Sequence, residues 1–462
     1  MKICFVSKKP QKTDIANLQL AVQKETFVFV NKNGDQILSV GIGPKDKINL
    51  RKFVLIARQI IAAAKRNRIK KIFIDIAEFD FAGFELSPYE TGRILAENFE
   101  MANFEFIKYK TNDCEKIFVQ EIYVKSDFGH DIKEGFEHGQ IIGTMVNGSR
   151  MLANTHGGEM TPQVLANEAL QIARKNKRIH AKILNLAQMK KMKMGGIVGV
   201  SQGSCEEPKF IILEYFNGPK KQAPIVLIGK GVTFDSGGLN IKPADACSDM
   251  FMDMSGGAAV MHALEAAAKL KIKKNIICLV PAAENMPSGT SYRPGDILKM
   301  MSGVTVEVIN TDAEGRILLA DAITFARRYK PKFVIDVATL TGAALVALGQ
   351  RASAVFSNDK KLLDILCYLG EKSGDYLWPL PLWEEYESEI KGDFADLSNV
   401  QKNHYGGAII GATFLHKFAK HLNWAHIDIA PRITAIEGDY LAKGSAGAAV
   451  RLLVRFLEKV TI

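Results

Sequence analysis

The order of apolar and polar positions predicts that the first part of the chain is a mixture of short strands and amphipathic helices. The Asn-Gly pair inside residues 32–35 favours a tight hairpin between two of the strands. A helical period of apolar residues covers 50–66, and a second one covers 91–101. The strands are expected at residues 2–7, 26–30, 36–42, 71–76, 104–110 and 116–124.

The second part of the chain has a different pattern, in which nearly continuous apolar runs alternate with helix-like segments. This pattern is typical of a parallel sheet covered on both faces. The runs lie at residues 223–229, 275–282, 304–309 and 333–340. We therefore predict an α/β protein. It would have a smaller N-terminal mixed α/β domain at 1–130, a linking helix at 131–155, and a larger C-terminal domain at 156–462 with a mostly parallel sheet covered by helices.

Length and composition support a globular protein. The chain has 462 residues, of which 47% are hydrophobic, and this is enough for two or three domains with their own cores. No apolar run is long enough to cross a bilayer, and the start of the chain lacks the pattern of a secretory signal. The six cysteines form no C-x-x-C pair, which argues against a zinc ribbon or a disulfide framework. We expect a cytoplasmic protein with no membrane partner.

The net charge of +10 leaves nucleic acid and anionic surfaces open as partners. The basic clusters at residues 64–71, 173–182 and 269–275 each fall at the end of a helix-like segment, where lysine and arginine interact favourably with the helix dipole and with water. Aromatic residues do not interleave with these charges as a stacking surface for nucleic acid would require. Solvated helix ends are the favoured interpretation, and DNA binding is the alternative.

Polar side chains follow the predicted strands of the second part at the point where each strand ends. Right-handed crossovers bring the carboxyl ends of parallel strands to one edge of a sheet, where ligands bind. We expect Asp253 to join them, because the small residues that follow it would let a helix start close to the sheet. The residues that follow the strands are Lys230, Asp235 and Lys242, then Glu284, then Asp312, Glu314 and Arg316, and finally Thr339, Leu340, Thr341 and Gly342.

Four carboxylates, those of Asp235, Asp253, Asp312 and Glu314, would then share a cleft with an apolar floor. They cannot all stay ionised in such a poorly solvated place unless cations or protons bind. A set of oxygen ligands with neither cysteine nor histidine nearby suits two divalent ions that share bridging carboxylates. The alternative is a set of separate helix caps and surface turns.

Three basic residues complete this group. Lys230 lies between two glycines after a buried strand, so its amine could lose its proton and become a nitrogen ligand. Lys242 could stay charged and stabilise an oxyanion, and its alternative role is that of a surface charge. Arg316 suits a small carboxylate-like or bicarbonate anion, and its alternative is a salt bridge to Glu314 or Asp312.

Four stretches carry a resemblance to the leucyl (cytosol) aminopeptidase family. They are KGVTFDSGGLNIKP from Lys230, MDMSGGAAV from Met252, NTDAEGRILLADAI from Asn310 and DVATLTGA from Asp336. The resemblance extends over essentially the whole predicted second domain, which would be the catalytic domain. It implies a two-metal exopeptidase that releases N-terminal residues, commonly leucine and other apolar ones, from peptides. It also implies assembly into a homohexamer.

By the positions of these motifs, the resemblance implies a role for each candidate residue. One ion would be held by Lys230, Asp235, Asp253 and Glu314, and a second one by Asp235, Asp312 and Glu314. Lys242 and Arg316 take the catalytic positions, with bicarbonate expected at Arg316. The ions are expected to be manganese or zinc, with magnesium as a third candidate. The pocket for the first side chain would be lined by Met250, Asn310, Thr339, Leu340, Thr341 and Gly342.

Two stretches depart from the family pattern. Family members often read HIDIAG near the C-terminus, whereas this chain has HIDIAPRIT from His426, and SAGAAV follows Gly444. Both lie where the substrate pocket would close, which bears on the preference for leucine.

Two other functions stay open: a two-metal phosphoesterase that uses the same carboxylates, and a DNA-binding structural role.

Overall fold

The chain forms two compact units, seen here in a computed structural model that describes residues 1–462 except 11–13, 24, 82–83, 113–115 and 462. The first unit comprises residues 1–147 and 435–443, and the second comprises 148–434 and 444–462. The division falls inside helix α3 (Gly129–Ala153). The predicted domain limits of 1–130, 131–155 and 156–462 stay a prediction. Cys114, one of the six cysteines, lies outside the described residues.

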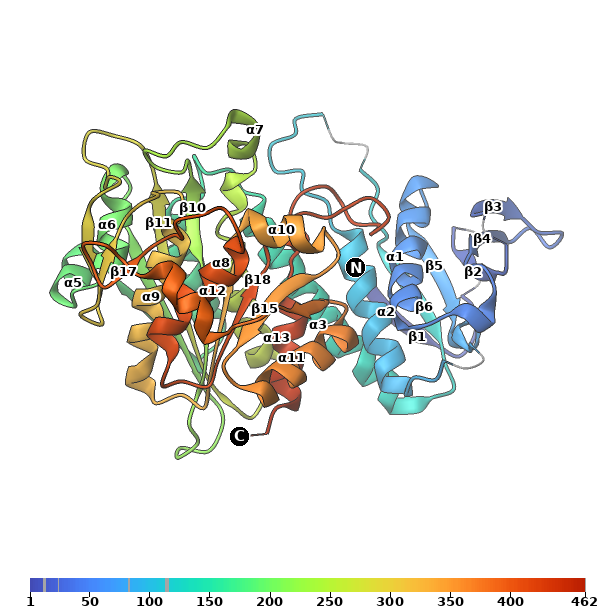
Figure 1. Ribbon diagram of the computed structural model, residues 1–462. Helices are drawn as coiled ribbons and strands as arrows, with labels where there is room; N and C mark the ends of the chain where they lie inside the picture. Colours follow the sequence, from blue (N-terminus) through green and yellow to red (C-terminus); the bar gives the residue numbers. More distant parts are fainter. Residues whose placement is uncertain (11–13, 24, 82–83, 113–115, 462) are drawn as a thin grey trace. The chain divides into compact units, whose positions relative to one another are not determined.

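The first unit contains a six-stranded sheet with the strand order β1-β6-β5-β2-β4-β3, in which only β3 runs antiparallel to its neighbour. Helices α1 and α2 lie side by side against it (Figure 1). The elements are β1 (Lys2–Val6), β2 (Ala16–Ala21), β3 (Phe27–Val30), β4 (Gln36–Gly41), η1 (Lys45–Lys47), α1 (Leu50–Arg66), β5 (Lys71–Asp75), η2 (Ile76–Phe79), α2 (Pro88–Asn103) and β6 (Glu121–Lys125).

Most predicted elements of this unit are found, and the differences have physical reasons. Strands β3 and β4 pair as a hairpin, with Gly34 at φ +82° in the turn between them. The strand predicted at residues 104–110 is wrong, because this segment has no partner in a sheet and is irregular. Strand β2 is missing from the prediction, since its sequence ANLQLA contains no β-branched residue. Parallel pairing with β4 and β5 on its two sides compensates for that weak propensity.

The second unit is built around a nine-stranded sheet with the order β16-β15-β18-β14-β9-β11-β8-β7, and β10 pairs with β11 outside this path. Parallel pairing joins β18, β14, β9, β11 and β10, which confirms the predicted mostly parallel sheet. The strands are β7 (Ile179–Leu184), β8 (Lys209–Phe216), β9 (Ile225–Gly229), β10 (Gly231–Asp235), β11 (Asn275–Asn285), β14 (Phe333–Ala338), β15 (Ser353–Ser357), β16 (Leu377–Pro379) and β18 (Trp424–Asp428).

Helices cover both faces of this sheet. Helix α9 packs with Val226 and Ile228 of β9 in one buried cluster. Successive side chains of a strand point to opposite faces, so α8, which also contacts β9, β11 and β14, covers the other face. The helices are α4 (Pro162–Lys175), α5 (Leu186–Lys191), α6 (Gly195–Val200), η3 (Ser201–Gly203), α7 (Ala244–Cys247), η4 (Met250–Met252), α8 (Ser255–Lys269), α9 (Glu314–Ala326), η5 (Arg327–Tyr329), α10 (Gly342–Leu348), α11 (Lys360–Ser373), η6 (Glu384–Ile390), α12 (Gly407–Ala419), η7 (Ala430–Arg432) and α13 (Val450–Lys459).

One predicted strand of the central sheet lies elsewhere. The run at residues 304–309 forms β13 (Thr305–Glu307), which pairs with β12 (Ile297–Lys299) and β17 (Leu397–Ser398) in a separate three-stranded sheet. A short apolar run predicts a buried strand but not the sheet to which the strand belongs. The stretch that follows β13 still reaches the edge of the central sheet, because α9 begins at Glu314 and packs against that sheet.

Two further findings concern the described residues. Their five cysteines are free thiols, which agrees with the absence of a disulfide pattern in the sequence. Within the same residues, no helix combines the length and the apolar character that a membrane span requires.

Asp321 in α9 is expected to be important for stability. Its buried carboxylate accepts hydrogen bonds from the backbone N–H groups of Gly196, Ile197 and Met301 at 2.8, 3.2 and 2.8 Å. Asp321→Ala would leave two buried donors and one partly buried donor unpaired, so we expect the free energy of unfolding of this unit to fall by about 3 kcal/mol. Urea denaturation measures this. Asp364→Asn, at a side chain that is 61% exposed, is the control and should change little.

Candidate functional site

Three carboxylates meet at the carboxyl edge of the central sheet. Asp235 ends β10, Asp312 follows β13, and Glu314 opens α9. One oxygen from each of them lies within 4.8 Å of the others. Asp235 and Glu314 are 2% and 1% exposed, so these charges meet in a place with little water, whereas the side chain of Asp312 is partly open. These residues are far apart in the sequence, and Asp312 and Glu314 reach this edge through the start of α9 rather than through a strand of the central sheet.

Lys230 connects this cluster to Asp253. Its Nζ lies 2.8 Å from Oδ2 of Asp253 and 2.8 Å from Oε1 of Glu314, and it donates to the carbonyl oxygen of Thr339 at 2.9 Å. Lys230 occupies the single position between β9 and β10, while Asp253 lies between η4 and α8. Three of the four predicted carboxylates therefore lie within 4.8 Å of one another, and Lys230 connects the fourth, Asp253, to Glu314.

Two glycines allow these groups to come so close. A Cβ atom at Gly256, in the first turn of α8, would lie 2.1 Å from the carbonyl oxygen of Val337 in β14. The small residues after Asp253 therefore let this helix start against the sheet, as the sequence predicts. A Cβ atom at Gly315 would lie 2.8 Å from Nζ of Lys230. Any larger residue at position 315 would push the lysine away from the carboxylates.

Lys242 faces the same cluster from the glycine-containing turn after β10. Its Nζ lies 2.8 Å from Oδ2 of Asp235 and is also paired with Oδ1 of Asp312. The other oxygen of Asp235 accepts hydrogen bonds from the backbone N–H of Gly237 at 2.9 Å and from Nδ2 of Asn285 at 2.8 Å. These two donors fix the carboxylate so that Oδ2 is directed at the lysine.

The electrostatics show how strongly these charges interact. Burial, together with the charge of Asp235, raises the pKa of Glu314 to about 8 and that of Asp253 to about 6. Burial and the charge of Asp235 also raise the pKa of Asp312. For the two lysines burial acts in the opposite direction, but the carboxylates outweigh it and raise the pKa of Lys230 and of Lys242. The cluster thus holds more negative groups than its two ammonium groups can balance.

The donor set fits divalent cations. Oδ2 of Asp253, Oε1 of Glu314 and Oδ1 of Asp312 are buried and lie within ion-pair distance of a lysine. None of these oxygen atoms accepts a hydrogen bond of good geometry from the described part of the chain. Such oxygen atoms have unused lone pairs. Carboxylate oxygens in this number and spacing suit magnesium, manganese or zinc.

Arg316 lies two residues after Glu314 and is 6% exposed. Its Nη1 donates to the carbonyl oxygen of Asn399 at 2.8 Å, and its Nε has no hydrogen-bond partner among the residues that the structure describes. Burial lowers the pKa of Arg316 to about 10 against the charges of Glu314, Asp428 and Asp312. In the described part of the chain no salt bridge joins Arg316 to the carboxylates of the cluster, so the guanidinium keeps donors for another anion.

Residues 339–342, which follow β14, form a wall beside the carboxylate cluster. Oγ1 of Thr339 donates to Oδ1 of Asp253 at 2.6 Å. The carboxylate of Asp428 accepts from the backbone N–H of Leu340 at 3.1 Å and from Oγ1 of Thr341 at 2.7 Å. Gly342 then opens α10. This segment is fixed from both sides by buried carboxylates.

The two other candidates for the substrate pocket lie next to members of the cluster in the chain. Met250 is half-buried and opens the η4 turn, which ends one residue before Asp253. Asn310 is also half-buried, and its Oδ1 accepts from the backbone N–H of Asp312 at 2.8 Å.

Sequence reasoning missed three polar residues of this region. Asn285 holds Asp235, Asn399 contacts both Arg316 and Asn310, and Asp428 holds the wall. Asp428 had a signal that could have found it, because it ends the apolar strand β18 at the same sheet edge. Glu284, which the strand-end rule included, instead accepts a hydrogen bond from Oγ of Ser204 at 2.6 Å.

A buried group of carboxylates and lysines at the carboxyl edge of a mostly parallel sheet places the chain among α/β metalloenzymes. Comparisons with known proteins are more specific. Residues 147–454 match the catalytic domain of the cytosol aminopeptidase family, and residues 22–113 match its N-terminal domain. The chain belongs to the cytosol aminopeptidase family and is a metal-dependent aminopeptidase.

Individual relatives agree with this assignment. A probable cytosol aminopeptidase of Nitrosococcus oceani is 38% identical over 93% of this chain and 86% of its own length. One of Geobacter sulfurreducens is 43% identical over 79% of this chain and 74% of its own. Among solved structures, the bottromycin maturation enzyme BotP in complex with Mn superposes with a TM-score of 0.86 at 30% identity, covering 97% of this chain and 99% of its own. Family membership and this manganese-containing neighbour support divalent metal binding, and the phosphoesterase alternative is not favoured.

Proposed function

We propose that the carboxylate cluster releases N-terminal amino acids, leucine and other apolar residues among them, from peptides with the help of two divalent ions. The observation that carries this proposal is the meeting of Asp235, Asp312 and Glu314 within 4.8 Å, with Lys230 and Lys242 in contact with them. Manganese or zinc is the expected metal, with magnesium as a third candidate.

Each ion has its own ligand set in this proposal. The first set is Lys230, Asp235, Asp253 and Glu314, and the second is Asp235, Asp312 and Glu314. When bound, the ions supply a Lewis acid that lowers the pKa of water from 15.7 to about 7 and polarises a carbonyl group. Asp235 and Glu314 belong to both sets, which their central position among the lysines supports.

Lys230 changes its protonation state in this proposal. The carboxylates of Asp253 and Glu314 raise the pKa of its amine in the protein alone, although burial acts against them. Cations on the same carboxylates cancel that negative charge, and burial then favours the neutral amine, which can donate a lone pair.

Lys242 and Arg316 supply the positive charges of the reaction. Lys242 stays protonated beside Asp235 and Asp312 and stabilises the negative charge that develops on the oxygen of the scissile carbonyl. Arg316 would hold bicarbonate, because its buried guanidinium keeps an unpaired Nε and makes no ion pair with the cluster among the described residues.

The pocket for the first side chain accounts for the selection of substrates. Its proposed lining consists of Met250, Asn310, Thr339, Leu340, Thr341 and Gly342. The free α-amine of the substrate is the expected contact to the metal ions, which would restrict cleavage to the end of the peptide. The HIDIAPRIT stretch begins with the last three residues of β18, and Asp428 is one of them. Because Asp428 binds the backbone of Leu340, the departure of this stretch from the family pattern would affect the shape of the pocket.

Two further proposals concern location and assembly. We propose a cytoplasmic homohexamer, since several large apolar side chains of the second unit are left exposed and an interface between subunits would bury them. The exposed side chains are Val346, Trp378, Trp383, Phe394 and Tyr405, at 87%, 62%, 62%, 83% and 82%. Light scattering on the purified protein tests the mass.

DNA is a second candidate partner because of the basic helix ends, and salt-sensitive duplex binding that survives Asp312→Asn would support it.

The proposed function is tested by hydrolysis of free-amine aminoacyl amides before and after chelation, with manganese, zinc and magnesium returned separately. We expect leucine amide to be cleaved, chelation to abolish the activity, and N-acetyl-leucine amide to resist cleavage. Turnover of phosphate esters in preference to amides, or full activity after the metal has been removed, would contradict the proposal.

Asp428→Ala is expected to raise the KM for leucine amide by about tenfold, because losing two hydrogen bonds of about 0.5–1.5 kcal/mol each loosens the wall that positions the side chain. The metal content should not change, since Asp428 is outside both proposed ligand sets. Thr341→Val removes one of the two bonds and should give a smaller increase. Steady-state kinetics separate KM from kcat, and an unchanged KM in both variants would rule out a positioning role.

A further inference from the structure

The first unit contains a cavity of about 480 Å³ whose lining residues all belong to that unit. Its volume lies within the range of about 300–1,000 Å³ that is usual for small-molecule sites. Much of its wall comes from the segments that follow β5 and β6, at residues 75–80 and 126–128. These strands are parallel neighbours, with Asp75 opposite Lys125 at their ends. The cavity therefore lies at the carboxyl edge of a parallel sheet, where ligands typically bind.

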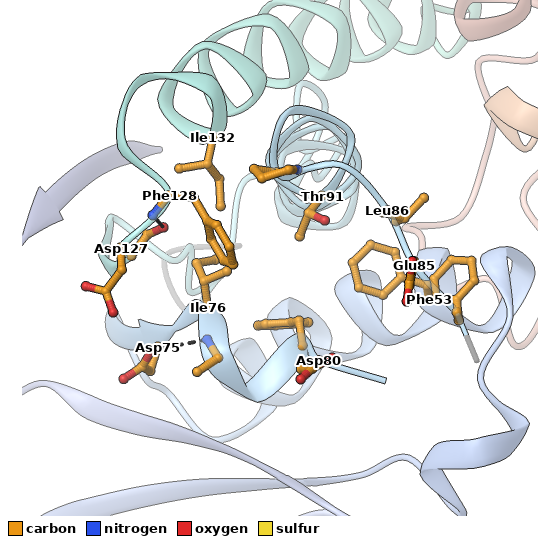
Figure 2. Close-up of a pocket in the computed structure, with 15 residues that line it drawn as sticks. Phe53, Asp75, Ile76, Asp80, Glu85, Leu86, Thr91, Asp127, Phe128 and Ile132 are labelled. Atoms are coloured by element: carbon orange, nitrogen blue, oxygen red, sulfur yellow. Dashed lines mark hydrogen bonds between the residues drawn. The ribbon is translucent and has the colours of Figure 1, made fainter. Parts of the chain in front are cut away.

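The floor of the cavity is aromatic. The ring of Phe53 lies 6.0 Å from that of Phe79 and 5.8 Å from that of Phe84, measured between centroids. Phe53 and Ile132 are buried, whereas Phe128 is 55% exposed and Phe84 is half-buried. Figure 2 shows Phe128 beside Ile76 at the cavity and Phe53 on the opposite side. A ligand that enters this space would bury an apolar body against these side chains.

The rim of the cavity is acidic. Asp75, Asp80, Glu85 and Asp127 all line it, and no lysine, arginine or histidine does so among the described residues. Figure 2 places Asp75 and Asp127 on one side, Asp80 below, and Glu85 beside Phe53 on the other side. Asp75 is already paired with Lys125 at 2.7 Å, which leaves three exposed carboxylates around the opening.

The negative charge of this rim determines which class of ligand can bind. The chain as a whole carries a net charge of +10, so an all-acidic lining is a local reversal of charge. Three carboxylates around one opening repel phosphates and carboxylates and attract cations. The aromatic floor requires an apolar body, and the faces of phenylalanine rings add attraction for an ammonium group nearby.

We propose that this cavity binds a small organic ammonium ion with an aromatic or branched apolar body. The body packs on Phe84 and Phe128, above the buried rings of Phe53 and Phe79, and the ammonium group lies at the rim formed by Asp80, Glu85 and Asp127. The site is independent of the carboxylate cluster in the second unit, and it does not rest on the proposed function of that cluster.

Isothermal titration calorimetry on the whole protein tests the proposal with three probes of similar shape and different charge. The probes are 2-phenylethylamine, 2-phenylethanol and 3-phenylpropanoate. We expect the amine to bind at least about tenfold more tightly than the alcohol, a factor that corresponds to about 1.4 kcal/mol, and the anion to give no detectable heat. Equal affinities for the three probes, or no binding of the amine, would overturn the proposal.

Variants then locate the binding site. The combined substitution Asp80→Asn, Glu85→Gln and Asp127→Asn should weaken amine binding about tenfold or more, and Phe128→Ala should weaken it through the apolar body. All four side chains are exposed, so these changes should leave the fold intact. Asp46→Asn replaces an exposed carboxylate outside the cavity and should have no effect.

The amine could also enter the carboxylate cluster of the second unit, and Asp312→Asn separates the two sites. Binding to the cavity should survive this substitution. Amine binding that disappears in Asp312→Asn but persists in the combined cavity variant would show that the ligand sits in the cluster, and the proposal would then be wrong.

Discussion

Asp235→Asn is expected to lower kcat/KM for leucine amide by about a thousandfold, the upper end of what a single electrostatic contact contributes in an active site. Asp235 belongs to both proposed ligand sets, so the metal content should fall as well. The asparagine carbonyl can still accept from Gly237 and Asn285, as the aspartate does at 2.9 and 2.8 Å. The local fold is thus preserved while one ligand oxygen and one negative charge are lost.

Steady-state kinetics and the metal-to-protein ratio by mass spectrometry measure this effect. Asp364→Asn is the matched control, because it makes the same chemical change at a side chain that is 61% exposed. A variant that keeps both its metal and its rate would show that Asp235 is not a ligand. Circular dichroism confirms that any loss of activity does not come from unfolding.

Lys242→Met is expected to lower kcat about 100- to 1,000-fold while the KM and the metal content change little. The reason is that an ammonium group acting on a developing oxyanion contributes in the transition state rather than in substrate binding. Burial opposes its charge, but Asp235, Glu314 and Asp312 together raise the pKa of Lys242, so the group is protonated at neutral pH. Methionine preserves the length of the side chain and removes only the charge.

The split between kcat and KM distinguishes this role from a structural one. Lys220→Met is the control at an exposed lysine of the same unit. A rise in KM with an unchanged kcat would mean that Lys242 binds the substrate only in the ground state. A loss of metal in Lys242→Met would instead indicate that the lysine holds Asp235 and Asp312 in place.

The central sheet and the members of the cluster could be predicted because both follow from local sequence features. Strands such as β9 and β14 are buried on both faces, so their residues are apolar without interruption. Parallel strands end at one edge, which places Asp235 at the end of β10. Glu314 reaches the same edge through the start of α9, because the strand before it belongs to a separate sheet.

Other parts could not be predicted because they depend on partners that the local sequence does not specify. The run that forms β13 looks like a core strand, but its neighbours β12 and β17 draw it into a separate sheet. The function of Asn285 depends on which acceptor its side-chain amide faces after folding, which is the carboxylate of Asp235. A lone amide in an apolar stretch does not specify that contact.

The return of residues 435–443 to the first unit limits how freely evolution can exchange the two units. A fragment that stops at residue 147 would lack this excursion, which supplies the carbonyl oxygen of Asp439 that accepts from Nη1 of the buried Arg58 at 3.4 Å. The N-terminal unit is therefore not one continuous segment, and a single gene fusion could not transfer all of it. Transferring this unit to another catalytic unit would require the exchange of two separate segments, residues 1–147 and 435–443, together.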